Sequence, residues 1–213
     1  MTRIGVMGGT FDPIHVGHLA IAEEAREALE LETVLFVPAG QPPHKRADEV
    51  TNVEHRLAMV ELAIADNRAF ELSRIEIDRT GPSYTVDTLE ALARAESDGA
   101  EEWPSPELTL ILSAETFAEL PTWHEPERLF EAASMAVVPR EGYPPPDPAW
   151  LSRVFPGREA RVTYLEGPRL GLSSTAIRAR VVAGRSIRYL VPRAVEAWIA
   201  DHGLYTNRRT AST

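Results

Sequence analysis

Short apolar runs alternate along this chain with stretches in which apolar residues recur at helical spacing. Residues 3–7 (RIGVM) form one apolar run that ends at a glycine pair, and residues 33–37 (TVLFV) form a second, which Pro38 stops. Both runs predict buried strands, because a strand covered on both faces is apolar throughout. Between them, residues 19–29 carry apolar side chains at helical spacing, with glutamates on the other faces. The N-terminal part therefore predicts strand, helix, strand.

The same alternation continues towards the C-terminus. Further helices are expected at 53–65, 85–96, 126–132, 175–182 and 192–199, and further strands at 70–77, 108–112, 136–138 and 162–165. Strands that alternate with helices pair in parallel through right-handed crossovers. We therefore expect an α/β fold, a mostly parallel sheet with helices on both faces, which binds ligands at the carboxyl ends of its strands.

We expect one domain over residues 1–205. A chain of 213 residues supplies one sizeable core without forcing a second. Residues 97–106 and 140–148 are rich in proline, glycine and polar residues and predict surface loops. The polar tail, 206–213, is expected to be disordered.

Net charge and composition limit the kinds of molecule that the protein can be expected to bind. The net charge of −10 disfavours a nucleic-acid or membrane surface, because both need a basic footprint. No apolar run approaches the roughly 18 residues of a transmembrane helix, and no secretory leader is recognised. The absence of cysteine fits a reducing compartment, so we expect a soluble, cytoplasmic protein and leave open whether it forms a homo-oligomer.

A glycine-rich loop follows the first predicted strand and leads into the first helix. It reads GGTFDPIHVGH over residues 8–18. Glycines let backbone N–H groups approach a phosphate, and a helix N-terminus adds a positive dipole end. The loop matches neither GxGxxG nor a Walker A sequence, so it predicts an anion site of another kind.

His15 and His18 are three residues apart at the helix start, so both rings can face one ligand, and Gly17 leaves room for it. Imidazoles in this place can donate to phosphoryl oxygens. Two other interpretations exist: His15 caps the helix and His18 packs within it, or the pair binds zinc, for which further ligands at a usual spacing are missing. The preceding strand and glycine loop favour the phosphate site.

A second candidate segment, LSSTAIR over residues 172–178, places hydroxyls before a helical pattern and Arg178 in its first turns. Ser173 or Ser174 would serve as an ordinary N-cap. The same hydroxyls, the free N–H groups of a helix start and a guanidinium would also hold a polyphosphate. The segment alone leaves both interpretations open.

Together, the loop and this second segment resemble the paired signatures of the HxGH nucleotidyltransferases. Within that superfamily the chain is most similar to the bacterial nicotinate-nucleotide adenylyltransferases, and the resemblance extends from Arg3 to about Tyr205. Four further segments carry it: PPHK at 42–45, EHRxxM at 54–59, SYTxDTL at 83–89 and LPTWH at 120–124.

The resemblance implies a Rossmann-like nucleotidyltransferase fold and a reaction in NAD biosynthesis. Nicotinate mononucleotide would attack the α-phosphorus of ATP, giving deamido-NAD and pyrophosphate. Because the nucleophile is already an anion, catalysis would consist of positioning and electrostatic stabilisation. Mg²⁺ would travel on the ATP phosphates, so we expect no metal ligands from the protein.

The resemblance also implies the roles of single residues. The catalytic residues would be His15, His18 and Arg178. The ATP-binding residues would be Gly8, Gly9, Thr10, Phe11, Gly17, Ser173, Ser174 and Thr175. The mononucleotide-binding residues would be Lys45, Thr85, Trp123, His124 and Glu115, with Trp123 stacked on the pyridine ring and its carboxylate bound by Thr85 and by backbone N–H groups around Trp123 and His124.

Glu115 marks a departure from the family pattern. The family usually has Gly-x-Asp after the fourth strand, whereas this chain has Ser113-Ala114-Glu115. This departure leaves open a nucleotide-binding sensor with a decayed site. A second alternative is an adenylyltransferase for another phosphorylated acceptor such as phosphopantetheine.

Overall fold

A computed structural model gives the structure of the chain and describes residues 2–42, 46, 50–95, 106–143 and 147–206. Within these residues the strands form one six-stranded sheet in the order β3-β2-β1-β4-β5-β6, and every pair is parallel. The strands are β1 (Arg3–Gly9), β2 (Thr33–Pro38), β3 (Phe70–Leu72), β4 (Glu107–Ser113), β5 (Ser134–Val138) and β6 (Val162–Tyr164). The expected parallel sheet is confirmed.

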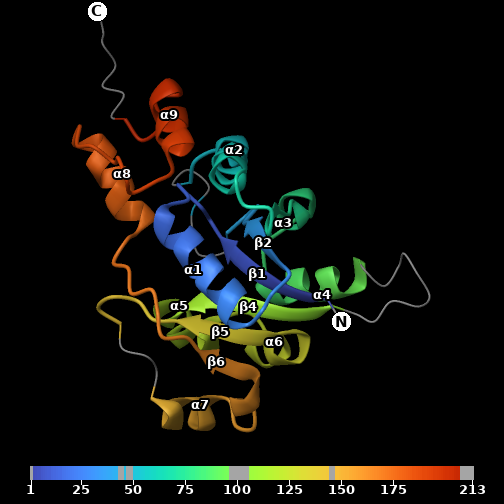
Figure 1. The fold of residues 1–213 in the computed structure, drawn as a ribbon. Helices are drawn as coiled ribbons and strands as arrows, with labels where there is room; N and C mark the ends of the chain where they lie inside the picture. Colours follow the sequence, from blue (N-terminus) through green and yellow to red (C-terminus); the bar gives the residue numbers. More distant parts are fainter. Residues whose placement is uncertain (1, 43–45, 47–49, 96–105, 144–146, 207–213) are drawn as a thin grey trace, which may run out of the picture.

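Helices cover both faces of this sheet (Figure 1). One face carries α1 (Val16–Ala28), α2 (Val53–Ile64), α8 (Ser174–Val182) and α9 (Arg193–Asp201). The other carries α4 (Thr85–Ala95), α5 (Ala114–Ala118), α6 (Pro126–Ala132) and α7 (Pro148–Val154). The short α3 (Ile75–Asp78) follows β3.

Two apolar cores result, one on each face, because alternate strand residues point to opposite sides. In β4, Leu108, Leu110 and Leu112 pack under α4 to α7, whereas Ile111 packs under α1 and α8. The apolar runs of the sequence thus reflect strands that are buried on both faces of the sheet.

The sheet opens at the point where the chain reverses its direction of winding. β1 pairs with β2 up to Gly9 but with β4 only up to Val6 opposite Leu110. Beyond that pair β1 and β4 part, and their carboxyl ends line a crevice. In a doubly wound sheet of this order, such a switch point is where ligands bind.

The strand expected at 70–77 is only partly correct. β3 ends at Leu72, and Ile75 begins the helical turn α3. An edge strand with three paired residues leaves the chain free to turn, and the Ile-Glu-Ile alternation at 75–77 is short enough to fit either structure. Two further short helices, α5 and α7, were not expected from the sequence; α7 begins at Pro148, the last residue of the predicted loop.

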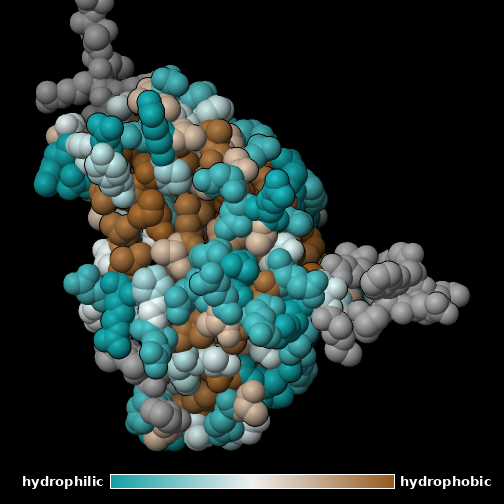
Figure 2. Space-filling model, viewed as in Figure 1, coloured by the Kyte–Doolittle hydropathy of each residue, from teal (hydrophilic) through white to brown (hydrophobic). Residues whose placement is uncertain are grey.

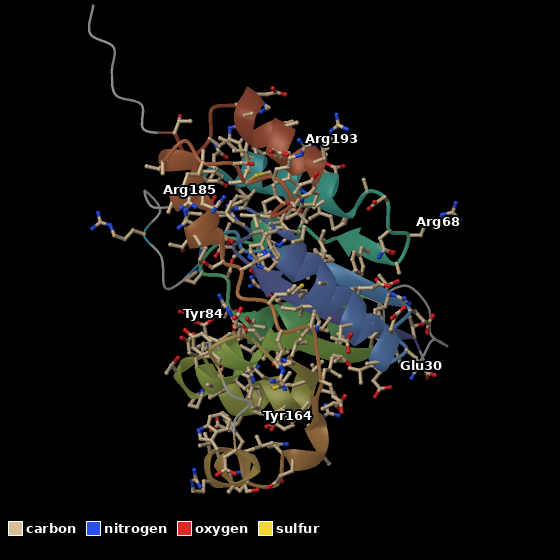
Figure 3. The ribbon with its side chains drawn as sticks, turned by 60° about the vertical axis from the view of Figure 1, so that its left-hand side comes forward. Glu30, Arg68, Tyr84, Tyr164, Arg185 and Arg193 are labelled. Atoms are coloured by element: carbon tan, nitrogen blue, oxygen red, sulfur yellow. The ribbon has the colours of Figure 1, made fainter. Side chains whose placement is uncertain are left out.

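Charged side chains such as Glu30, Arg68 and Arg193 project outwards (Figure 3). Figure 2 shows a mostly hydrophilic face on which hydrophobic residues gather between α8 and α1. Among the described residues, no helix has the length and apolarity needed to cross a bilayer. The predicted tail lies outside the described residues, except for Thr206.

Candidate active site

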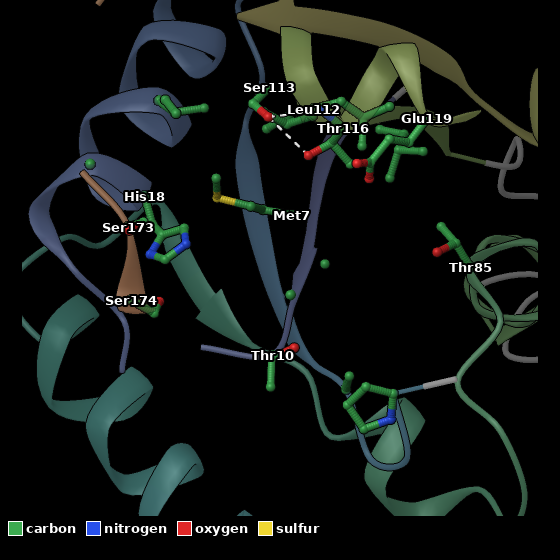
Figure 4. Close-up of a pocket in the computed structure, with 18 of the residues that line it drawn as sticks. Met7, Thr10, His18, Thr85, Leu112, Ser113, Thr116, Glu119, Ser173 and Ser174 are labelled. Atoms are coloured by element: carbon green, nitrogen blue, oxygen red, sulfur yellow. Dashed lines mark hydrogen bonds between the residues drawn. The ribbon is translucent and has the colours of Figure 1, made fainter. Parts of the chain in front are cut away.

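A pocket of about 880 Å³ occupies the crevice between β1 and β4. This size suits a nucleotide-sized ligand. In Figure 4, His18, Ser173 and Ser174 lie on one side, Thr85 lies on the other, and Met7 and Thr10 lie between them. The predicted site residues that line the pocket are Gly8, Gly9, Thr10, His15, Gly17, His18, Thr85, Trp123, His124, Ser173, Ser174 and Thr175.

The two histidines form one stacked unit at the start of α1. Their ring centroids are 3.7 Å apart, and the edge of Phe11 packs against His18 at 5.1 Å. The backbone N–H of His15 donates to Nδ1 of His18 at 3.1 Å. Because Nδ1 accepts, the ring proton of His18 is on Nε2, which can donate to a ligand. His18 thus caps the helix with Nδ1 and keeps Nε2–H as a donor for a ligand.

Both imidazoles are neutral at pH 7. Burial, helped by the Arg140 guanidinium, lowers the pKa of His15 from 6.5 to about 4. Burial, followed by His15 and Arg140, lowers the pKa of His18 well below 6.5. Among the described residues, the buried Nδ1 of His15 has no hydrogen-bond partner. A buried polar atom left unpaired is costly, and such an atom calls for a functional or structural reason.

Gly17 lets two segments of the site approach each other closely. A Cβ at position 17 would lie 3.0 Å from Nδ1 of His15 and 3.5 Å from Cβ of Leu172. The start of α1 and the segment before α8 therefore approach each other closely, and only glycine allows the approach without displacing the His15 ring.

The start of α8 is bound to the glycine loop. Ser173 is the N-cap and accepts from the Ala176 N–H at 3.2 Å, while Ser174 donates to the Pro13 carbonyl at 2.8 Å. Arg178 donates to the Asp12 carbonyl at 2.7 Å and does not line the pocket. The two segments that the sequence analysis singled out are thus brought together, and the role of Arg178 as a phosphate ligand stays a prediction.

Phe11 is likewise outside the pocket wall. Its ring is buried between His18 and Phe36 and supports the histidine from behind. Lys45 lies outside the described residues, so its role stays a prediction.

The opposite end of the pocket combines aromatic rings with a helix start. Tyr84 and His124 stack with centroids 4.2 Å apart, and Thr85 begins α4. Free N–H groups at a helix N-terminus favour an anion such as a carboxylate. Trp123 packs partly against the core, and its backbone N–H already donates to the Leu120 carbonyl at 3.0 Å. Of the backbone N–H groups around Trp123 and His124 that were expected to bind the carboxylate, that of Trp123 is therefore already hydrogen-bonded within the protein.

The structure does not place Glu115 on the pocket wall. Its carboxylate pairs with Arg140 and accepts from the Tyr143 hydroxyl, an interaction that raises the pKa of Tyr143. Arg140, which does line the pocket, also donates to the Leu172 carbonyl at 3.3 Å. Glu115 contacts the pocket only through Arg140, because the side chain of the first α5 turn points to the loop after β5.

The sequence analysis missed Arg140 and Glu76. Arg140 was assigned to a surface loop, although a cation directly after a parallel strand is itself a signal of a site. Glu76 lies on the pocket wall, is buried, and accepts from the Thr88 hydroxyl at 2.8 Å. Burial raises the pKa of Glu76. It was hidden inside the strand expected at 70–77.

Within the part of the chain that the structure describes, no group of three or more His, Cys, Asp or Glu side chains is placed to hold a metal ion.

Known proteins resemble this chain along nearly its whole length. The profile of the family described as Cytidylyltransferase-like matches residues 6–180. A protein of Roseiflexus sp. (strain RS-1) named probable nicotinate-nucleotide adenylyltransferase is 52% identical over 202 residues, 95% of this chain and 97% of that protein. A protein of the same name from Thermus thermophilus is 46% identical over 95% of this chain and 99% of its own length.

Solved structures agree on the fold. Plasmodium falciparum nicotinic acid mononucleotide adenylyltransferase, complexed with NaAD, matches with a TM-score of 0.77 and 17% identity over 96% of this chain and 98% of that one. The same protein complexed with APC matches with a TM-score of 0.76 and 16% identity.

Proposed function

The chain belongs to the cytidylyltransferase-like family and, within it, to the nicotinate-nucleotide adenylyltransferases, and we propose that the pocket between β1 and β4 carries out that family's reaction. The enzyme transfers the AMP part of ATP to nicotinate mononucleotide and releases deamido-NAD and pyrophosphate, a step of NAD biosynthesis. One observation carries the assignment to this pocket: its two ends differ in chemistry. Hydrogen-bond donors suited to phosphate lie at one end, and aromatic rings beside a helix start lie at the other.

ATP occupies the end formed by the glycine loop and the starts of α1 and α8. The loop residues Gly8 to Phe11 and the hydroxyls of Ser173, Ser174 and Thr175 surround its phosphates. Arg140 adds a full positive charge on the same wall. Arg178 donates to the Asp12 carbonyl of the loop and is proposed to exchange part of that contact for a phosphate oxygen.

Nicotinate mononucleotide occupies the end formed by Thr85, Trp123 and His124. Its pyridine ring stacks on Trp123, and its carboxylate faces the Thr85 hydroxyl and the N–H groups at the start of α4. N–H donors favour a carboxylate, which only accepts, over an amide, which would bring its own NH₂ group towards them. The site therefore prefers the acid to nicotinamide mononucleotide.

Catalysis consists of alignment and charge stabilisation. The mononucleotide phosphate attacks the α-phosphorus in line, and pyrophosphate leaves on the opposite side, so no base is needed. The Nε2–H of the neutral His18 donates to a phosphoryl oxygen whose charge grows in the transition state. His15 packs against that ring and holds its orientation.

Mg²⁺ arrives as the complex with ATP. The pocket wall contributes two carboxylates, Glu76 and Glu119, and Glu76 is engaged with Thr88. This donor set suits an ion carried on the β- and γ-phosphates rather than one bound by the protein. Lys45 is proposed as an additional cation near the mononucleotide or pyrophosphate. We further propose that residues 1–205 act as one domain and that the reaction takes place in the cytoplasm.

Pyrophosphate release from Mg·ATP tests the function when nicotinate mononucleotide, nicotinamide mononucleotide and phosphopantetheine are offered separately, with His18→Ala as the control. Turnover with the nicotinate compound alone, lost in the control, is the expected result. Turnover with phosphopantetheine would move the chain to the alternative acceptor, and ATP binding without release from any acceptor would make it a sensor.

A further inference from the structure

Asp12 is a buried acidic residue of the glycine loop, and the proposed mechanism assigns no role to its carboxylate. Its side chain is 3% exposed, and each carboxylate oxygen has a different partner. Oδ2 accepts from the Thr51 backbone N–H at 3.1 Å, and Oδ1 accepts from the Tyr205 hydroxyl at 2.7 Å. The second contact joins the loop to a residue 193 positions later in the chain.

The loop around Asp12 needs to be held in place. Phe11 has a φ of 50°, a backbone conformation that costs a non-glycine residue roughly 1–3 kcal/mol and persists only when its surroundings impose it. Arg56 donates to the Thr10 carbonyl at 2.9 Å, and Arg178 donates to the Asp12 carbonyl at 2.7 Å. Neither arginine lines the pocket.

These contacts set the direction of the loop amides. In a trans peptide the carbonyl and the next N–H point opposite ways. Because Arg56 binds the Thr10 carbonyl and does not itself line the pocket, this contact fixes the orientation of the peptide between Thr10 and Phe11, and with it the direction of the Phe11 N–H. Thr51 links Asp12 to Arg56, because its backbone N–H donates to Oδ2 of Asp12 and its carbonyl accepts from Nε of Arg56 at 3.0 Å. The geometry of the amides therefore depends on Asp12 and on what binds it.

We infer that Tyr205 is a positioning residue of the ATP site, which fixes the glycine loop through Asp12. Tyr205 follows α9, and α9 packs against α2, the helix that carries Arg56 (Figure 1). Its ring is packed against the core, with the hydroxyl also 4.0 Å from Sδ of Met59. The last helix of the chain thereby becomes part of the nucleotide site without touching the nucleotide.

The inference rests on the proposed function in that the ligand of the loop is ATP. The test is designed to separate the two. Binding of Mg·ATP is measured by calorimetry without any acceptor, well below the melting temperature, and turnover is measured separately. If the wild type binds Mg·ATP but turns over no acceptor, the proposed function fails while the role of Tyr205 remains measurable.

Tyr205→Phe removes the hydroxyl and keeps the ring. A hydrogen bond to a buried charge is worth more than tenfold in an equilibrium, so we expect the Kd of Mg·ATP to rise roughly tenfold. The KM of nicotinate mononucleotide should change much less, because its ring and carboxylate are assigned to the side of Thr85, opposite the start of α8 (Figure 4). Tyr189→Phe is the matched control, since Tyr189 belongs to the same C-terminal region and is 80% exposed.

A double-mutant cycle identifies the path. In an Asp12→Asn background, Tyr205→Phe should weaken Mg·ATP binding much less than in the wild type, because the charge that strengthens the hydrogen bond is gone. A Tyr205→Phe variant with a lower melting temperature and an unchanged Kd for Mg·ATP would show that Tyr205 only stabilises the fold. Equal effects of Tyr205→Phe in both backgrounds would show that it does not act through Asp12. Either result would overturn the inference.

Discussion

Replacing His18 by asparagine or by glutamine separates the two hydrogen bonds assigned to its ring. Nδ1 accepts from the His15 backbone N–H, and we assign to Nε2–H the donor role towards the pocket that His18 lines. An asparagine oxygen can take the place of Nδ1 but offers no donor at the position of Nε2. A glutamine NH₂ group reaches the position of Nε2 but leaves the His15 N–H without its acceptor.

The two losses have different magnitudes. Removing one preorganised donor to a developing oxyanion costs about 10²–10³ in kcat, or about 2.7–4 kcal/mol. Removing a helix cap costs about 1 kcal/mol of folding free energy, which lowers the melting temperature of a domain of this size by roughly 2–4 °C. We therefore expect His18→Asn to lose rate and keep its stability, and His18→Gln to lose stability and keep most of its rate.

Pyrophosphate release at saturating Mg·ATP and nicotinate mononucleotide measures the first effect, and thermal unfolding of the same preparations measures the second. The reasoning is refuted if His18→Asn retains kcat within a few-fold of the wild type. It is refuted equally if both variants lose rate to the same extent, because His18 would then act only by filling space beside Phe11.

Three further predictions concern other parts of the pocket. As pH falls from about 6.5 to about 4, His15 is protonated in the unfolded chain but stays neutral in the folded protein, so the wild type loses up to about 3 kcal/mol of folding stability. The stability of His15→Asn, measured by denaturant titration, should depend less on pH over this range. An equal pH dependence in the two proteins would contradict this. Arg140→Gln should lower kcat/KM for Mg·ATP by roughly 10–100-fold and Glu115→Gln by much less, since only Arg140 lines the pocket; similar losses in steady-state kinetics would refute the distinction. Trp123→Ala should raise the KM of nicotinate mononucleotide about tenfold with little change for Mg·ATP, and an unchanged KM would rule out the stacking.

The sequence predicted most of the sheet because its strands are buried on both faces. Runs such as residues 33–37 and 108–112 are apolar at every position except Thr33 and Thr109, a pattern that does not depend on knowing which helix covers them. The glycine loop was identifiable for the same reason, since its residues and its place after a strand are local properties. Local signals failed at 75–77, where three alternating residues fit a strand and a helical turn equally well.

The missed parts of the site depend on contacts between distant segments. Nothing near Arg140 in the sequence reveals that its guanidinium reaches Leu172, or that Glu115 binds it. Glu115 was expected at the substrate because the family that the chain resembles has a site aspartate at that position, but the side chain of one residue in a short helix can face either way. Only the assembled fold decides which carboxylate meets the ligand.

The fold also explains how an acidic chain can bind polyphosphate. The net charge is −10, and of the basic residues near the phosphate end, Arg140 is paired with Glu115 and Arg178 is bound to the loop. The parallel sheet instead brings the N-termini of α1, α4 and α8 to the edge where β1 and β4 separate, because each helix starts shortly after the carboxyl end of a strand or folds back to it. In the proposed mechanism, backbone N–H groups and neutral imidazoles bind the anion at fixed positions. Such donors need no titration or reorganisation during the transfer, which is the property that transition-state stabilisation requires.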